Sequence, residues 1–312
     1  MTKKYIYMYS YHEDEDFLCK LEMRSLFGFD TSSSILHSTI KRDPSRSPFI
    51  KARVDVLFQE ASIEQLIKNV KELNTIEQTC KVMFVQHGDQ KKTNKVEFQQ
   101  RRSIEREVGL NLPGEVDLVN PEIIFGILKV DEGWVFGDYI KSKAVWLKHQ
   151  VKPHNYSTAL STRVARAVVN IAVPDPNGLK VIDPCCGIGT VLIEALSMEI
   201  DIVGRDLNPL VIPGARGNVA YFGYTGEVVL GDMRNVTNNY DVAIIDMPYN
   251  LCSIITSKEK LEMIQSARQF SRKVVIVTVE PMDLVIEAAG FEIVDRCVAR
   301  KGTFSREVLV CH

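Results

Sequence analysis

Short apolar runs alternate with longer helix-like stretches through the second half of the chain. The runs are LKVID from Leu179, DIVG from Asp201, EVVL from Glu227, DVAII from Asp241 and KVVIVTV from Lys273. Runs of this length with amphipathic segments between them are typical of buried parallel strands joined by helices. FEIVDRCVAR and REVLVCH, at the end of the chain, predict a hairpin around KGTFS. The pattern therefore predicts an α/β fold with a mostly parallel sheet and an antiparallel hairpin.

The first half of the chain mixes strands and helices in a different order. YIYMYSY, ARVDVLFQ, KVMFVQHG and two parts of VDLVNPEIIFGILKVDEGWVFGDY predict strands. DEDFLCKLEMRSLFG, SIEQLIKNVKEL and RRSIEREVGLNL predict helices, the first of them ending before Gly28 and the second beginning at Ser62. The apolar side of the first helix would consist of Phe17, Leu18, Leu21 and Leu26. We therefore expect a separate α+β region here.

The turn DPCCGIGT, from Asp183 to Thr190, lies between an apolar run and the helix-like VLIEALSM. Glycines in such a turn let a nucleotide-like ligand approach the backbone and the helix N-terminus. The turn lacks the third glycine of GxGxxG, and the Asp183 carboxylate would repel a pyrophosphate. The same carboxylate would attract sulfonium and ammonium groups. The turn therefore favours S-adenosylmethionine, which carries both cations and no phosphate.

Three further carboxylates follow three of the apolar runs. Asp206 ends DIVGRD, Asp232 follows VVLG, and Asp246 ends DVAIID. Because the carboxyl ends of parallel strands meet at one edge of a sheet, we expect these side chains on one rim. Asp206, after the second run, has the position of an acid that accepts hydrogen bonds from a ribose diol.

The motif DMPY, from Asp246 to Tyr249, combines a carboxylate, a carbonyl and an aromatic ring. An exocyclic amine on a nucleobase is a poor nucleophile because its lone pair is delocalised into the ring. Hydrogen bonds from the amine to the Asp246 carboxylate and the Pro248 carbonyl would turn the lone pair toward a methyl donor. Tyr249 would stack on the base. The motif predicts methyl transfer to a planar amine with these three catalytic residues and no metal.

DPCCGIGT, VGRDLNP, GDMR and DMPY, in that order, resemble the motifs of class I methyltransferases, including those with a (D/N/S)-PP-(Y/F) motif that methylate amines. Within that class the chain resembles RNA guanine-N2 methyltransferases with a THUMP domain, among them the tRNA guanosine-10 type. The resemblance implies a Rossmann-like domain with a mostly parallel seven-stranded sheet, S-adenosylmethionine as the cofactor and tRNA as the substrate. Met247 and Asn250 depart from the family motif, which leaves the identity of the base open.

The same resemblance assigns cofactor contacts. The residues at the methionine end would be Asp183, Cys185, Gly187, Gly189 and Thr190. Asp206 and Leu207 would contact the ribose, and Asp232 and Met233 would contact the adenine. Asp246 would face both the cofactor and the base. HNYSTALSTRVARAVVNIA resembles the helix before the first motif, from which Ser157, Thr158 and Leu160 would line the cofactor. An amphipathic helix with Leu160, Val164, Ala167, Val168 and Ile171 toward the core explains the same segment, and both interpretations can hold.

The end of the first half, VDLVNPEIIFGILKV and a strand from Trp134, resembles the end of a THUMP domain, whose role is to engage tRNA. We expect a ferredoxin-like segment at 1–48, a THUMP-like RNA-binding domain at 49–140, a linker at 141–156 and the methyltransferase domain at 157–312. Two basic clusters favour RNA as a partner. They are Lys91, Lys92, Lys95, Arg101, Arg102 and Arg106, and Lys141, Lys143, Lys148 and Lys152 around Trp146.

Composition limits these interpretations. The 312-residue chain has a formal net charge of −2, so an RNA-binding surface must be local. Its seven cysteines are scattered, and Cys185 and Cys186 lack further ligands at metal-site spacing, so we expect reduced packing cysteines. No apolar run is long enough to cross a bilayer, and MTKKYIYMYSYHEDEDF lacks the pattern of a signal peptide. We expect a cytoplasmic protein without membrane contact, and the sequence leaves a small activating subunit open.

Several alternatives stay open at this point. Adenine-N6 methylation of DNA or RNA uses the same X-Pro-Tyr chemistry, although a THUMP-like region disfavours DNA. A non-catalytic RNA-binding protein could keep a methyltransferase-like scaffold. A nicotinamide-dependent oxidoreductase is disfavoured by the missing third glycine. A guanine paired in a duplex would also have to be flipped out before its amine could react.

Overall fold

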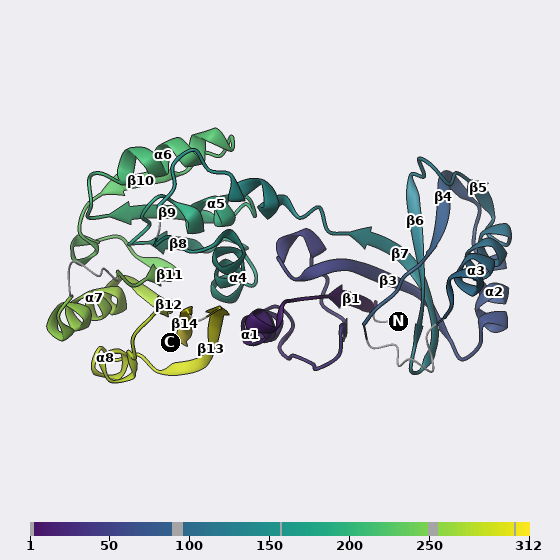
Figure 1. Ribbon diagram of the computed structural model, residues 1–312, viewed down its shortest axis with the longest axis horizontal. Helices are drawn as coiled ribbons and strands as arrows, with labels where there is room; N and C mark the ends of the chain where they lie inside the picture. The colour runs from purple at the N-terminus through teal and green to yellow at the C-terminus, as the bar shows by residue number, and fades with distance from the viewer. Residues whose placement is uncertain (1–2, 89–95, 157, 249–254, 303) are drawn as a thin grey trace. The chain divides into compact units, whose positions relative to one another are not determined.

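The computed structural model describes residues 3–88, 96–156, 158–248, 255–302 and 304–312. The chain divides into two compact units (Figure 1). The first unit comprises Met1–Ser10, Thr31–Ser45 and Phe49–Lys143, and the second comprises Tyr11–Asp30, Arg46–Pro48 and Ala144–His312. The units therefore do not follow the linear order expected from the sequence, because a segment near the N-terminus packs within the second unit. The THUMP-like assignment of 49–140 stays a prediction.

The first unit is built on a seven-stranded sheet of order β2-β1-β3-β7-β6-β4-β5. Its strands are β1 (Tyr5–Tyr9), β2 (Ile35–Ser38), β3 (Ile50–Glu60), β4 (Ile76–Phe84), β5 (Gly114–Val116), β6 (Ile123–Val130) and β7 (Gly133–Lys141). Its helices are α2 (Ile63–Lys71) and α3 (Phe98–Leu110), and both bury apolar side chains against β4, β6 and β7. Ser62 caps α2 by accepting a hydrogen bond from Gln65 N, as its position predicted.

The second unit contains a seven-stranded sheet of order β10-β9-β8-β11-β12-β14-β13. Its strands are β8 (Lys180–Asp183), β9 (Asp201–Asp206), β10 (Glu227–Leu230), β11 (Tyr240–Asp246), β12 (Ser271–Thr278), β13 (Ile293–Lys301) and β14 (Phe304–Cys311). The neighbouring pairs among β8 to β12 are parallel, and β14 is antiparallel to both of its neighbours. The predicted α/β fold with a terminal hairpin is confirmed.

Helices cover both faces of this sheet. They are α4 (Thr162–Ala172), α5 (Thr190–Leu196), α6 (Ile212–Tyr221), α7 (Ser257–Phe270) and α8 (Asp283–Ala288). The helices α4, α5 and α6 lie along one face and α7 and α8 along the other (Figure 1). The α4 helix begins later than the expected segment from His154, because Ser161 caps it by accepting a hydrogen bond from Val164 N.

Successive side chains at the end of β11 point to opposite faces of the sheet. Ile245 and Met247 belong to the apolar core that α7 and α8 cover. Since side chains alternate along a strand, Asp246 lies on the opposite face, which α4 covers. Asp246 pairs with Val277 on β12, and Val277 pairs with Val308 on β14. These three residues therefore form a row across the α4 face.

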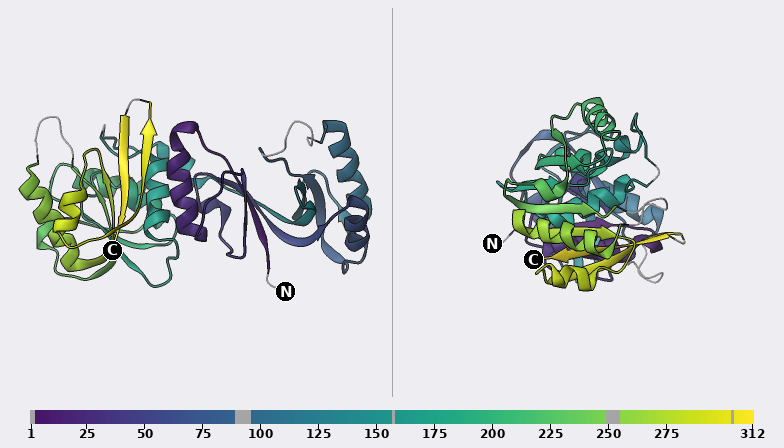
Figure 2. Two further views of the ribbon diagram at one scale, coloured as in Figure 1. Left: turned by 90° about the horizontal axis from the view of Figure 1, so that it is seen from below. Right: turned by 90° about the vertical axis from the view of Figure 1, so that its left-hand side faces the viewer.

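An additional helix, α1 (Asp16–Phe27), packs against α4 and β13 in the second unit, where it is purple beside the yellow hairpin in Figure 2. Arg24 donates two hydrogen bonds of 2.9 Å to Asp295 on β13. Arg163 of α4 donates to both carboxylate oxygens of Glu15 at 2.8 and 2.7 Å. Phe17 is 53% exposed, so its predicted place on the apolar side is wrong; it points away from the surface that packs on α4.

Polar side chains lie between α1 and the rest of this unit, although apolar ones dominate its core. Glu22 of α1 accepts hydrogen bonds from Asn170 and Ser47, and all three residues are buried. Arg166, also buried, donates to Glu194 at 2.7 Å. These bonds satisfy polar groups that would otherwise be costly to remove from water. The face of α4 under α1 therefore requires polar partners from residues 11–48.

The described part of the chain lacks two features. None of its helices has the length and apolar character needed to cross a membrane. It also contains no cluster of three or more histidine, cysteine, aspartate or glutamate side chains that could hold a metal ion.

Candidate active site

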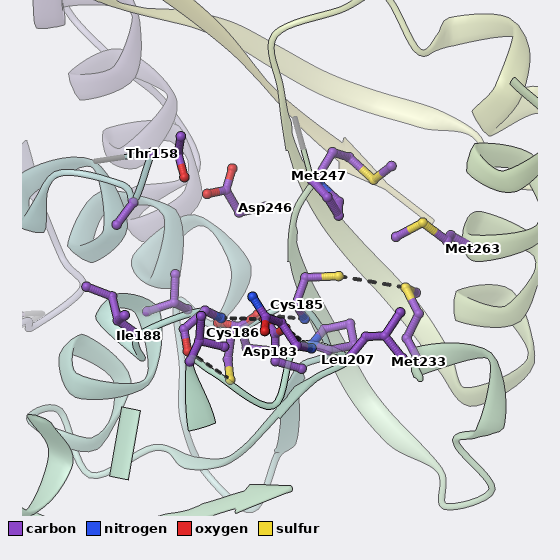
Figure 3. Close-up of a pocket in the computed structure, with 18 of the residues that line it drawn as sticks. Thr158, Asp183, Cys185, Cys186, Ile188, Leu207, Met233, Asp246, Met247 and Met263 are labelled. Atoms are coloured by element: carbon purple, nitrogen blue, oxygen red, sulfur yellow. Dashed lines mark hydrogen bonds between the residues drawn. The ribbon is translucent and has the colours of Figure 1, made fainter. Parts of the chain in front are cut away.

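A pocket of about 560 Å³ lies in the second unit at the carboxyl ends of β8, β9 and β11 (Figure 3). The residues predicted for the site that line it are Thr158, Leu160, Asp183, Cys185, Gly187, Thr190, Asp206, Leu207, Asp232, Met233, Asp246 and Pro248. Gly189 does not line the pocket but forms the N-terminal cap of α5. Ser157 and Tyr249 lie outside the described residues.

The DPCCGIGT segment forms a tight turn between β8 and α5. Gly187 and Gly189 have φ values of 51° and 81°, a region that favours glycine. The N–H of Gly187 donates to Asp206 Oδ2 at 2.7 Å, and the N–H of Cys186 donates to the Arg205 carbonyl at 2.9 Å. The turn is thus tied to the end of β9, which brings the predicted methionine-end and ribose residues to one side of the pocket.

Carboxylates crowd this pocket. Asp183 is 2% exposed, and burial together with the nearby Asp246 and Asp206 carboxylates raises its pKa well above the usual range. Two buried polar atoms that line the pocket, Thr190 Oγ1 and Asp246 Oδ1, have no hydrogen-bond partner among the residues that the structure describes. A cationic ligand with hydrogen-bonding groups would relieve both conditions. The acids therefore fit the sulfonium and ammonium groups of S-adenosylmethionine.

The acids at the other strand ends have different environments. Asp206 accepts backbone N–H bonds from Gly187 and from Asn208, at 2.7 and 2.8 Å, which leaves lone pairs on both oxygens for a ribose diol. Asp232 is bound by the Arg234 side chain and backbone, and these hydrogen bonds lower its pKa. Asp232 is therefore held ionised, as a hydrogen-bond acceptor for an adenine amine must be.

Asp246, at the end of β11, is the least satisfied of these acids. Burial raises its pKa to about 7, and the Arg306 cation opposes that rise. Its carboxylate can therefore be ionised near neutral pH, while its Oδ1 atom lacks a hydrogen-bond partner in the described part of the chain. A carboxylate in this state is suited to accept a hydrogen bond from a ligand amine.

Sulfur-containing side chains form one part of the pocket wall. Cys185 Sγ lies 3.9 Å from Met233 Sδ, and Met247 and Met263 continue the wall (Figure 3). Burial and nearby carboxylates raise the pKa of Cys185 well above its usual range, so it is a packing thiol and not a nucleophile. Met263 was not predicted from the sequence, and neither were Glu259, Arg234 and Tyr156, which also line the pocket.

The two basic clusters differ in structure. On α3, the Arg101 and Arg102 guanidinium groups lie 5.5 and 5.4 Å from the centre of the Phe98 ring, which is 60% exposed. Lys91, Lys92 and Lys95 are outside the described residues. In the second cluster Trp146 and Lys152 are buried, whereas Lys141, Lys143 and Lys148 are exposed. The Lys152 stem packs inward and its Nζ donates to the His149 carbonyl.

The sheet order and the glycine turn give the second unit the fold of class I methyltransferases, with an acid-lined pocket at the carboxyl ends of the strands. Residues 149–287 match the family model described as "RMKL-like, methyltransferase domain". This match confirms the resemblance to methyltransferases found in the motifs.

Curated relatives and a solved structure extend the comparison. The chain is 28% identical over 172 residues to a tRNA (guanine(10)-N2)-dimethyltransferase of Methanothermobacter thermautotrophicus, which is 52% of this chain and 51% of that protein. It is 26% identical over 162 residues to the protein of the same name from Pyrococcus abyssi, 48% of each chain. The chain thus spans about half the length of these relatives. The crystal structure of TrmN from Thermus thermophilus aligns over 99% of both chains with a TM-score of 0.50 and 17% identity, which shows a shared fold.

Proposed function

We propose that this chain is an S-adenosylmethionine-dependent methyltransferase that modifies the exocyclic N2 amine of a guanosine in tRNA. One observation carries the proposal: the buried Oδ1 atom of Asp246, which has no hydrogen-bond partner among the described residues, lies in the same pocket as the acid-lined glycine turn. The names of the curated relatives support guanine and tRNA as the targets.

The cofactor is proposed from the chemistry of the pocket. S-adenosylmethionine would supply an electrophilic methyl group on a sulfonium. Asp183 and the backbone of the DPCCGIGT turn would bind its methionine end, and Asp206 would accept hydrogen bonds from the ribose. Asp232, held ionised by Arg234, would accept a hydrogen bond from the adenine amine. Met233 and Leu207 line the pocket beside these acids and exclude water from the adenine.

The acceptor chemistry follows from Asp246 and its neighbour Pro248. Asp246 Oδ1 would accept one N–H of the guanine amine, and the Pro248 carbonyl would accept the other. The amine lone pair then points at the methyl group instead of into the ring, so positioning provides most of the rate. Tyr249 follows in the sequence and would stack on the base. No general base has to act before attack, because the amine becomes acidic only as it gains the methyl group.

The first unit would supply the contact with tRNA. The exposed Phe98 ring with Arg101 and Arg102 on α3 supports this role, since arginines and aromatic rings bind phosphates and bases. The THUMP-like assignment of 49–140 agrees with such a role. A tRNA substrate would place the reaction in the cytoplasm, and a small activating subunit remains compatible with the proposal.

The first experiment measures both cofactor and product. Calorimetry should detect S-adenosylmethionine binding that weakens in Asp206→Ala. Incubation with labelled cofactor and total tRNA, followed by nucleoside digestion, should yield N2-methylguanosine or its dimethyl form. Methyladenosine would replace the guanine assignment with an adenine one. Absence of cofactor binding would overturn the catalytic proposal and favour an RNA-binding protein with a methyltransferase scaffold.

A second experiment tests the role of Asp246. Asp246→Asn keeps the size of the side chain but replaces one acceptor oxygen with an N–H₂ donor, so we expect kcat to fall on the order of 10²-fold. Asp241→Asn is the matched control, because Asp241 is an exposed acid at the other end of β11. Full activity in Asp246→Asn would contradict the mechanism, whereas equal losses in both variants would indicate damage to β11.

A further inference from the structure

One cation on the sheet face of Asp246 has no part in the mechanism above. Asp246, Val277 and Val308 form a row across the α4 face of the sheet. Arg306 lies two residues before Val308 on β14, so its side chain points to the same face. Because β14 runs antiparallel to β12, Arg306 lies toward the carboxyl ends of the parallel strands, where the pocket is.

Arg306 also bonds to a residue that lines the pocket. Its Nη2 donates a hydrogen bond of 2.9 Å to the carbonyl oxygen of Thr158. Thr158 and Asp246 both line the pocket, and both are labelled in Figure 3. The Arg306 guanidinium also lies 5.0 Å from the centre of the Phe304 ring. These contacts hold the guanidinium group beside the part of the pocket that Thr158 lines.

The remaining titratable groups around Asp246 do not stabilise its charge. Asp183 and Cys185, on the β8 side, would repel it when ionised. The α4 helix covers this face, but its cations are bonded elsewhere: Arg163 to Glu15, and Arg166 to Glu194. Within the described part of the chain, Arg306 is the cation that lowers the pKa of Asp246.

We propose that Arg306 is a positioning residue for methyl transfer, which keeps the Asp246 carboxylate ionised and ties the Thr158 wall of the pocket to the C-terminal hairpin. The inference rests on the proposed function, because Arg306 acts through the residue that accepts the amine. It assigns the hairpin a part in the reaction in addition to completing the sheet.

The test compares three substitutions in the full-length protein. Arg306→Gln keeps an N–H donor for the Thr158 carbonyl and removes the charge, and Arg306→Lys keeps the charge. Arg300→Gln is the matched control, because Arg300 is an exposed arginine on the same hairpin. Ala299 on β13 pairs with Arg306 and shares its face of the sheet, so the next residue, Arg300, points to the opposite face. The measurement is kcat/KM for methyl transfer to tRNA as a function of pH.

We expect Arg306→Gln to lower kcat/KM on the order of fivefold at about pH 7 and to converge with the wild type by about pH 9. Removing the cation raises the pKa of Asp246 further, so the acid limb of the profile moves to higher pH. Arg306→Lys should restore the limb, and Arg300→Gln should follow the wild type. A loss in Arg306→Gln by the same factor at every pH would overturn the inference.

A second readout needs no turnover. Carbon-13 labelling of aspartate carboxyl groups, with the Asp246 signal identified by its loss in Asp246→Asn, reports the titration of Asp246 directly. The Arg306→Gln variant should titrate at higher pH than the wild type. Identical titrations would overturn the role of Arg306, whereas a wild-type protein that transfers no methyl group to tRNA would overturn the proposed function instead.

Discussion

Replacing Glu22 with glutamine should change how the stability of the second unit depends on pH. The Glu22 carboxyl group is fully buried on α1, where it accepts a 2.6 Å hydrogen bond from Asn170 and another from Ser47. Burial raises its pKa from 4.5 to about 7, although the two hydrogen bonds and nearby arginines oppose the rise. Glutamine keeps an acceptor oxygen and the size of the side chain but does not titrate.

The magnitude follows from the two pKa values. Between about pH 4.5 and 7, the folded protein holds a proton on Glu22 that the unfolded chain has released. This contribution to stability is complete below pH 4.5 and is lost as the pH rises through about 7. The difference between these two pKa values corresponds to about 3 kcal/mol in the free energy of unfolding. Over this interval the free energy of unfolding of the wild type should fall by about 3 kcal/mol relative to Glu22→Gln.

Guanidinium unfolding at a series of pH values measures this difference. A Trp134→Phe background leaves Trp146 as the single tryptophan, and Trp146 lies in the second unit, so its fluorescence reports that unit. Glu13→Gln is the matched control, because Glu13 is an exposed acid of the same segment. If the stabilities of Glu22→Gln and the wild type run parallel from about pH 4.5 to 8, the reasoning from burial is refuted.

Three further outcomes are expected. Thr190→Val removes a buried hydroxyl that has no partner among the described residues, so the ligand-free protein should keep its stability or gain about 1 kcal/mol. Calorimetry should show weaker cofactor binding, and unchanged binding would exclude a contact between Thr190 and the ligand. Gly204→Ala would place a Cβ 2.5 Å from Leu192 Cδ2, which should cost about 1–3 kcal/mol in thermal unfolding, and an unchanged Tm would contradict that packing. Methyl transfer should reach half its maximum near pH 7 on the acid side, because Asp246 must lose its proton to accept the amine; a rate independent of pH would contradict this role.

The rim of the pocket could be predicted because it depends on local sequence. Asp206, Asp232 and Asp246 each follow a short apolar run, and the ends of parallel strands meet at one edge. The order of the motifs then resembled a known class of enzyme. The identity of the base could not be predicted in the same way, because it depends on the shape of the pocket. Met263 lines that pocket from α7, a helix that carries no recognisable motif.

Other features had no local signal. The pattern of α1 predicted an apolar side but could not indicate which core that side would join. Its partners Asn170 and Asp295 lie 148 and 271 residues away from Glu22 and Arg24. Arg306 is equally hidden, since its relation to Asp246 depends on the register of β12 and β14. Short strands such as β2 and β5 lack enough alternation to be recognised.

The place of α1 has a consequence for how the protein is made. Arg24 precedes Asp295 by 271 residues, so a helix that is synthesised early cannot make this contact until β13 has also been synthesised. Contacts over so many residues also favour slow folding. A fragment that begins at Ala144 would lack the helix and leave Asn170 and Arg166 of α4 without Glu22 and the Arg46 carbonyl. Work on the isolated catalytic half would therefore have to supply residues 11–48 as well.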